Sequence, residues 1–101
     1  MDKSNLSLMA KMSSLFGNEL RLSILMYLLE EGEVCVGKIV EALEIKQSTV
    51  SNQLKILKLG GVVKTRKERN KIFYSLADSH ISNLLIALSE HVKEDFYGQD
   101  S

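Results

Sequence analysis

The chain has 101 residues, a formal net charge of zero and 45% hydrophobic residues. This size and composition are typical of one globular domain, residues 1–101, and no apolar run of about 18 residues is present that would cross a membrane. Its single cysteine, Cys35, excludes a disulfide within the chain. Because the N-terminus also has no secretory apolar segment, we expect a cytoplasmic protein.

The charge is distributed unevenly along the chain. Residues 46–71 carry eight Lys or Arg and one acid, Glu68, while the segments before and after them are acidic. A basic segment of this kind is expected of a surface that binds phosphates. The alternative is that these charges form an ordinary solvated face. The excess of positive over negative charges in one short segment makes this alternative less suitable.

Two helices are predicted in the first third of the chain. Residues 4–16 have apolar side chains at helical spacing, with Ser4 or Asn5 as the expected cap and Gly17 as the expected end. The second helix is predicted over residues 19–31, between a capping Asn18 and a terminating Gly32. Its predicted inward residues are Leu22, Leu25, Met26 and Leu29. Arg21, on the other face, is expected to reach a phosphate or to pair with an acid.

Residues 36–43 and 47–59 are two short predicted helices joined by a three-residue turn, which indicates a helix-turn-helix over residues 36–59. Val50, Leu54 and Leu57 are expected to face inward. The outward face of the second helix has polar side chains of a size that can read base edges, and lysines that can reach phosphates. The predicted DNA-binding residues of this helix are Gln47, Ser48, Ser51, Asn52, Lys55 and Lys58, and Ser48 is also a candidate cap.

Residues 62–66 and 71–76 are rich in β-branched and aromatic side chains, and residues 67–70 join them. This pattern predicts a β-hairpin wing over residues 62–76, with Asn70 as the residue that takes a positive φ. The tip is cationic. Its predicted DNA-binding residues are Arg66, Lys67 and Arg69.

A last amphipathic helix is predicted over residues 78–97, capped by Asp78. Its apolar stripe consists of Ile81, Leu84, Leu85, Leu88 and Val92. A monomer of this size would leave part of the stripe exposed to water. We therefore expect residues 4–16 and 78–97 to form the interface of a homodimer.

Both histidines of the chain lie in this last helix, each beside a carboxylate: Asp78 with His80, and His91 with Glu94. Eleven residues bring His91 back to nearly the azimuth of His80, but about 16 Å along the axis, which is too far for one ion to bridge. An antiparallel partner helix removes this difficulty, and predicts two inter-subunit sites per dimer. Two imidazoles and two carboxylates suit Zn²⁺, with Co²⁺ or Ni²⁺ also possible. The alternative is two surface histidines and a capping Asp78.

With these motifs in the order α-α-α-α-β-β-α, the chain resembles the ArsR/SmtB family of metal-responsive repressors over about residues 15–95. The resemblance is carried by residues 19–29 (ELRLSILMYLL), 33–39 (EVCVGKI), 47–63 and 72–76 (IFYSL). It implies a mainly α fold with a small β-hairpin, a homodimeric winged helix-turn-helix that binds double-stranded operator DNA.

The resemblance also implies a zinc-sensing site at Asp78, His80, His91 and Glu94, and derepression of metal efflux or homeostasis genes when zinc binds. A second metal site of the family uses a Cys-x-Cys pair, and here Gly37 stands in place of the second cysteine. That second site is therefore incomplete, and Cys35 is expected to be a small buried residue.

Three other functions are less consistent with these motifs. A regulator of the same family could respond to a non-metal or redox signal, for which Cys35 is the sole redox-active group. A metal-buffering or interaction dimer would not bind DNA, and the basic segment argues against it. An enzyme is not expected, because the sequence has no catalytic triad or glycine-rich phosphate loop, and zinc with four protein ligands has no open position.

Overall fold

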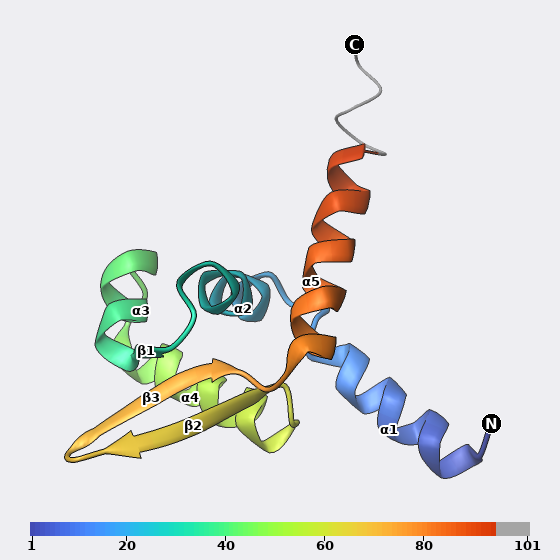
Figure 1. Cartoon of the computed structure of the whole chain (residues 1–101), viewed down its shortest axis with the longest axis horizontal. Coiled ribbons are helices and arrows are strands. Elements are labelled where there is room, and N and C mark those ends of the chain that lie inside the picture. Colours follow the sequence, from blue (N-terminus) through green and yellow to red (C-terminus); the bar gives the residue numbers. More distant parts are fainter. Residues whose placement is uncertain (95–101) are drawn as a thin grey trace.

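The computed structural model describes residues 1–94, which form five helices and a small antiparallel sheet (Figure 1). The elements in chain order are α1 (Lys3–Ser14), α2 (Glu19–Glu31), β1 (Val34–Cys35), α3 (Val36–Leu43), α4 (Gln47–Leu59), β2 (Val63–Glu68), β3 (Lys71–Leu76) and α5 (Ser79–Val92). The predicted winged helix-turn-helix is confirmed. We call α2, α3, α4 and the sheet the head; α1 and α5 project from it (Figure 1).

The ends of α1 differ from the prediction. Asp2, rather than Ser4 or Asn5, caps the helix: its carboxylate accepts hydrogen bonds from the Ser4 backbone N–H and, at 2.7 Å, from the Ser4 hydroxyl. The helix ends at Ser14 because the next three backbone N–H groups bond three residues back, from Leu15 to Met12 onwards. This tighter turn uses the last carbonyl groups of α1, and the Gly17 N–H donates the last of the three bonds.

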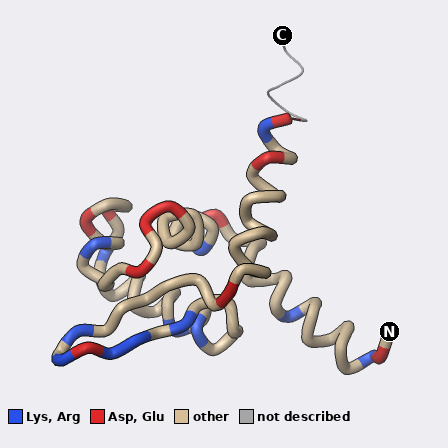
Figure 2. The backbone as a smooth tube through the Cα atoms, viewed as in Figure 1, with Lys and Arg blue, Asp and Glu red and all other residues tan. Residues whose placement is uncertain are grey.

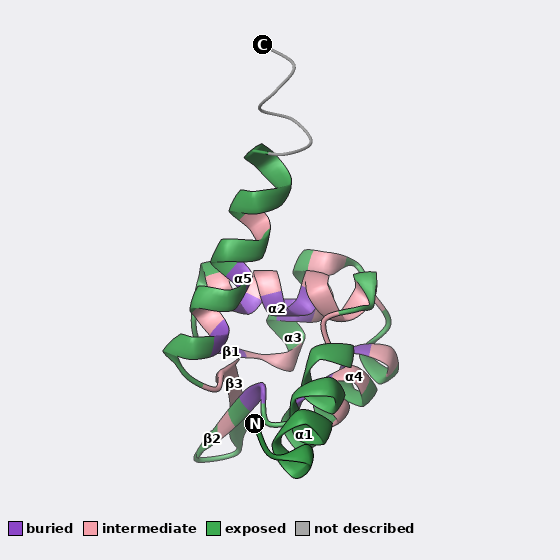
Figure 3. Ribbon diagram, turned by 90° about the vertical axis from the view of Figure 1, so that its right-hand side faces the viewer, coloured by how far each residue is buried: buried purple, intermediate pink, exposed green. Residues whose placement is uncertain are grey.

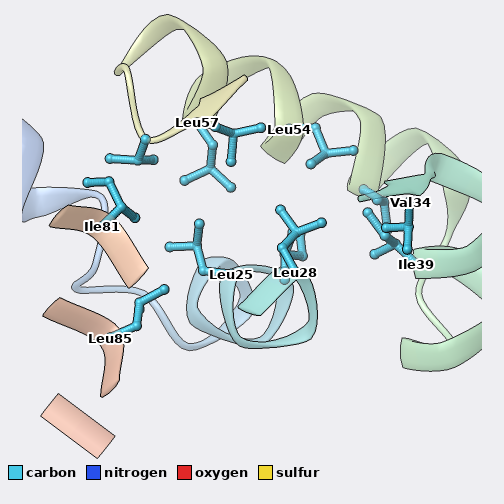
Figure 4. Close-up of a cluster of buried hydrophobic side chains, with 12 residues drawn as sticks. Leu25, Leu28, Val34, Ile39, Leu54, Leu57, Ile81 and Leu85 are labelled. Atoms are coloured by element: carbon cyan, nitrogen blue, oxygen red, sulfur yellow. The ribbon is translucent and has the colours of Figure 1, made fainter. Parts of the chain in front are cut away.

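The core lies where α2, α4, the sheet and α5 meet (Figure 4). Its buried residues are Ile24, Leu25, Leu28, Val34, Ile39, Val50, Leu54, Leu57, Val62, Val63, Ile81 and Leu85. The inward face of α4 is as predicted, but that of α2 is rotated. Leu25 alone of its four predicted inward residues is buried, and Ile24 and Leu28 join it. The helix is apolar on nearly all sides, so periodicity could not select the face.

The sheet has three strands in the order β1-β3-β2, all antiparallel. Pairing of Glu68 with Lys71 leaves a connection of two residues, Arg69 and Asn70, instead of the predicted four. Arg69 takes the positive φ of 57°, and the prediction of Asn70 for this role was wrong. When only one of the two residues in a hairpin turn has a positive φ, it is the first residue of the turn. The pairing of β1 with β3 was not predicted.

The two projecting helices expose most of their surface (Figure 3). No residue of α1 is buried. Helix α5 buries Ile81 and Leu85 in the core, whereas Leu84, Leu88 and Val92 are exposed. Residues 95–97, the end of the predicted last helix, lie outside the described residues. Among residues 1–94, the helices are too short or too polar for any of them to cross a membrane.

Candidate functional site

Helix α4 presents the predicted DNA-reading face to solvent. Val50, Leu54 and Leu57 are buried in the core, and this orients the opposite side of the helix outward. The six predicted contact residues are all exposed: Gln47, Ser48, Ser51, Asn52, Lys55 and Lys58. Ser48 is not the N-cap, because that position is Lys46, whose side chain makes no capping hydrogen bond. The Ser48 hydroxyl is therefore not committed to capping.

The exposed residues of α4 form a strip along one side of the helix. At about 100° per residue, Gln47, Ser51 and Lys58 lie within about 40° of one another, and Asn52 lies near the edge of the strip. The strip is about 16 Å long from residue 47 to residue 58, and an α-helix fits the width of the major groove of B-DNA. Such a strip can contact several successive bases and their phosphates.

The wing has two distinct faces. The pairing of Thr65 with Tyr74 and of Lys67 with Ile72 places these four side chains on one face. Ile72 and Tyr74 line a hollow together with Ser51 of α4, so this face borders the recognition helix. Lys67 therefore shares the α4 side of the wing. The adjacent Arg66 lies on the opposite face.

Arg66 is engaged within its own chain. Its Nε and Nη2 atoms donate to the Glu33 carboxylate at 2.8–3.1 Å, and Nη1 donates to Glu68 Oε2 at 3.0 Å. The guanidinium also stacks over the Phe73 ring, 4.8 Å from its centroid. The hydrogen bond from Arg66 lowers the pKa of Glu33, and the bond to Glu33 is the main cause of a raised Arg66 pKa. A phosphate contact by Arg66 has to compete with this cluster.

Positive charge gathers on the wing and beside it on α4, and acidic residues gather at the ends of α2 and α3 (Figure 2). Lys67 and Arg69 are exposed, as a phosphate contact requires. Lys71 was not among the predicted contact residues, yet it lines the same hollow as Ser51. Its membership of the basic segment 46–71 was the signal that could have identified it.

The N-terminus of α5 brings Asp78 and His80 together. Asp78 Oδ1 accepts a hydrogen bond from the Ile81 backbone N–H at 3.1 Å, which makes Asp78 the cap as predicted. The same oxygen is 3.7 Å from His80 Nδ1, and the His80 side chain is 92% exposed. Asp78, which lies just before the helix, therefore turns back towards His80. The Asp78 carboxylate and the His80 imidazole both present donor atoms to solvent.

His91 and Glu94 lie at the other end of α5 and are exposed. Along the helix His80, Leu84, Leu88 and His91 fall within about 80° of one another, so the histidines flank an exposed apolar strip. Within residues 1–94 of one chain, no three His, Cys, Asp or Glu side chains converge on a common point. A four-ligand site from these residues therefore needs a second chain, and the inter-subunit site stays a prediction.

A family model described as bacterial regulatory protein, arsR family, matches residues 18–65. An uncharacterized HTH-type transcriptional regulator of Methanocaldococcus jannaschii is 40% identical over 81 residues, which cover 80% of this chain and 91% of that protein. A cadmium resistance transcriptional regulatory protein CadC homolog of Staphylococcus aureus is 34% identical over 92 residues, covering 91% of this chain and 76% of that protein.

Two solved structures extend the likeness. The homodimeric winged helix-turn-helix DNA-binding domain of a possible ArsR-family transcriptional regulator from Mycobacterium bovis has a TM-score of 0.88 at 28% identity, covering 97% of this chain and 92% of that chain. HlyU from Vibrio cholerae has a TM-score of 0.79 at 34% identity, covering 89% and 96%. The 97% coverage of this chain by the Mycobacterium bovis domain includes the projecting helices as well as the head.

Proposed function

Because this chain belongs to the arsR family of bacterial regulatory proteins, we propose that it is a metal-sensing transcriptional repressor. The observation that carries the proposal is the exposed polar strip of α4 beside a cationic wing, in a fold that is shared with a homodimeric DNA-binding domain. The metal-free homodimer binds a palindromic operator in double-stranded DNA, with one α4 per half-site in successive major grooves.

The exposed side chains of α4 and the wing make two kinds of DNA contact, to base edges and to phosphates. Gln47, Ser48, Ser51 and Asn52 read base edges from the N-terminal half of α4. Lys55 and Lys58 reach phosphates beside the groove, and Lys67 and Arg69 do so from the wing. Arg66, held by Glu33 and Glu68, sets the position of the wing instead of contacting a phosphate.

The proposed metal ligands are Asp78 and His80 of one subunit with His91 and Glu94 of the partner subunit. The exposed Asp78–His80 pair supports this set, since its oxygen and nitrogen donors already lie close together. Bound Zn²⁺ would supply bonds that cross the subunit boundary, and Co²⁺ or Ni²⁺ suits the same donors. The cadmium resistance role in the name of one relative also favours a metal signal.

Helix α5 is well placed to pass a change at the subunit boundary to the head. Ile81 and Leu85 are buried among the residues that also hold α4. A change in the angle between the two α5 helices would therefore move the two α4 helices relative to each other. Derepression requires that the effector binds the low-affinity arrangement more tightly, by about 1–3 kcal/mol for a typical allosteric coupling. Metal efflux or homeostasis genes are the proposed targets.

The test is fluorescence anisotropy of the purified protein on its promoter DNA, first with EDTA and then with increasing Zn²⁺. We expect tight binding that zinc reverses. His91→Ala should bind DNA normally and no longer respond to zinc, while Glu90→Gln, an exposed acid of α5 outside the proposed set, should respond like the wild type. Release of DNA from His91→Ala at the same zinc concentration would refute the sensing mechanism.

A second candidate is a regulator of the same family that answers to a non-metal or redox signal. Cys35 favours it: the thiol is free, partly exposed, and lines the hollow that contains Ser51 of α4. An oxidant would then weaken operator binding in the wild type and not in Cys35→Ser, and EDTA and zinc would have no effect in either.

A further inference from the structure

Arg21 joins three elements of the chain. Its Nε donates to the Leu15 carbonyl at 3.0 Å, and Nη2 donates to the Ser14 carbonyl at 3.4 Å; both carbonyls lie at the end of α1. Its Nη1 donates to Gln53 Oε1 of α4, also at 3.4 Å. Arg21 itself belongs to the first turn of α2. Its side-chain hydrogen bonds within residues 1–94 thus go to two carbonyls and an amide, and the predicted pairing with an acid is not among them.

The position of Gln53 separates Arg21 from the DNA-reading strip. Gln53 is partly buried and lies two residues after Ser51, which places it about 160° around α4 from that residue. A guanidinium bonded to Gln53 therefore approaches α4 from the core side. Arg21 can affect DNA binding through the orientation of α4, and not through a contact of its own.

Helix α1 depends on few contacts for its position. It has no buried residue, and two of the contacts between its end and the head reach α4 or the residue directly after it. One is the Arg21 fork. The other is Gly60, directly after α4, where an added Cβ would collide with the Leu15 side chain. Both contacts join the same two parts, the end of α1 and helix α4, so α1 and the recognition helix are positioned together.

We propose that Arg21 is a positioning residue for DNA recognition, which sets the angle between the dimerisation helix α1 and the recognition helix α4. This inference rests on the proposed function, in which α1 contributes to the subunit interface and two α4 helices must match successive major grooves. A guanidinium is suited to the role because its donors form a rigid planar fork, whereas a lysine ammonium is a single point on a flexible stem.

Two variants distinguish positioning from a phosphate contact. Arg21→Lys keeps the positive charge but not the fork, and Arg21→Gln removes both. We expect both to weaken operator binding roughly tenfold, the size of losing a hydrogen bond to a charged group. Because no phosphate contact is lost, the slope of log Kd against log salt concentration should be unchanged. Lys3→Gln, which removes an exposed charge from α1, is the matched control and should bind like the wild type.

A second measurement does not involve DNA. A spin label at Lys55→Cys in a Cys35→Ser background reports the distance between the two α4 helices of the dimer by double electron–electron resonance. We expect a narrow distance distribution with Arg21 present and a broadened or displaced one in Arg21→Lys. Gln53→Leu should produce a smaller effect in the same direction, and adding it to Arg21→Gln should produce little more, since the two residues act as one unit.

The possible outcomes separate the two proposals. Full affinity for Arg21→Lys with a weaker salt dependence in Arg21→Gln, by about one unit of slope, would make Arg21 a phosphate contact and overturn the inference. Unchanged label distances in both variants would also overturn it. Absence of operator binding by the wild type would refute the proposed function, and the label distances would still decide whether Arg21 sets the position of α4.

Discussion

Two arginines three positions apart in the wing have different surroundings. Arg66 is held by two carboxylates and an aromatic ring, whereas Arg69 occupies the turn with a φ of 57°. A positive φ costs a non-glycine residue about 1–2 kcal/mol, and only Gly, Asn and Asp adopt it readily. Arg69 therefore keeps a cation at the tip at the expense of backbone strain.

Replacing Arg69 with glycine should release this strain. We expect Arg69→Gly to stabilise the fold by about 0.5–1 kcal/mol, the strain relieved less the greater flexibility of glycine in the unfolded chain. The midpoint of urea unfolding checks this. Arg69→Lys is the control, since it keeps both the positive φ and the charge. Equal or lower stability of the glycine variant would show that Arg69 is not strained.

The proposed difference between Arg66 and Lys67 is testable by salt dependence. Lys67→Gln should lower the slope of log Kd against log salt by about one, because one phosphate contact is lost. Arg66→Gln should weaken binding with the slope unchanged, because it releases the wing without removing a phosphate contact. Anisotropy at several salt concentrations measures both. A reduced slope for Arg66→Gln would mean that Arg66 leaves Glu33 and contacts the DNA.

The two helices that project from the head expose several large apolar side chains along their length. Leu8 in α1 and Leu84 and Leu88 in α5 are 62%, 50% and 43% exposed. Within residues 1–94 of one chain these side chains stay exposed, and water contact on several large apolar side chains is unfavourable by about 25 cal/mol per Å². This is the element-level reason to expect a second copy of the chain against α5.

A charge introduced into the exposed apolar strip of α5 should separate the subunits. Leu88→Glu is expected to convert the dimer into a monomer at micromolar concentration, since it removes apolar contact and places like charges near the two-fold axis. Sedimentation velocity measures the change, and circular dichroism should show the head still folded. Asn83→Glu adds the same charge about 140° around the helix and should remain dimeric. A dimeric Leu88→Glu would place the interface elsewhere.

The whole dimer, as proposed, shares each metal site between subunits, and this has a specific consequence for mixed dimers. One site combines His80 of the first subunit with His91 of the second, and the other site combines the reverse pair. A heterodimer of His80→Ala and His91→Ala subunits therefore has one site that lacks both histidines and one complete site. Either homodimer alone has two incomplete sites.

Mixing the two inactive variants should thus restore zinc binding. After subunit exchange about half of the dimers are heterodimers, so we expect about one quarter of the wild-type high-affinity zinc, measured by competition with a chelating dye. The separate variants serve as controls. Restoration would be impossible if both histidines of a site came from one chain, and its absence after verified exchange would refute the shared site.

Much of the fold was predictable because its signals act over a few residues. Asn18 and Asp78 cap their helices through carbonyl or carboxylate oxygens that accept N–H groups three residues on, and Gly32 ends α2 with a positive φ. Apolar spacing identified the buried side of α4 and hence its exposed strip. The approach of Asp78 to His80 also followed from their positions, two residues apart at the start of one helix.

The contacts that the sequence did not predict depend on residues far apart in the chain. Glu33 and Arg66 are separated by 33 positions, and Arg21 and Gln53 by 32, so no local pattern shows that these side chains meet. The same holds for the pairing of β1 with β3, which places Val34 opposite Tyr74. In α2, apolar on nearly every side, the choice of buried face was made by the elements packed around it.

The sequence alone therefore determined the order of the five helices and the two hairpin strands, the polar face of α4 and the positions of the histidines along α5, since spacing and capping are local properties. The tertiary structure alone decided which partners these groups have. It placed Arg66 in an ion-pair cluster, placed Lys67 on the α4 side of the wing and used Arg21 to join α1 to α4. These outcomes follow from packing, because a side chain's partners are chosen by what the fold brings within hydrogen-bonding distance.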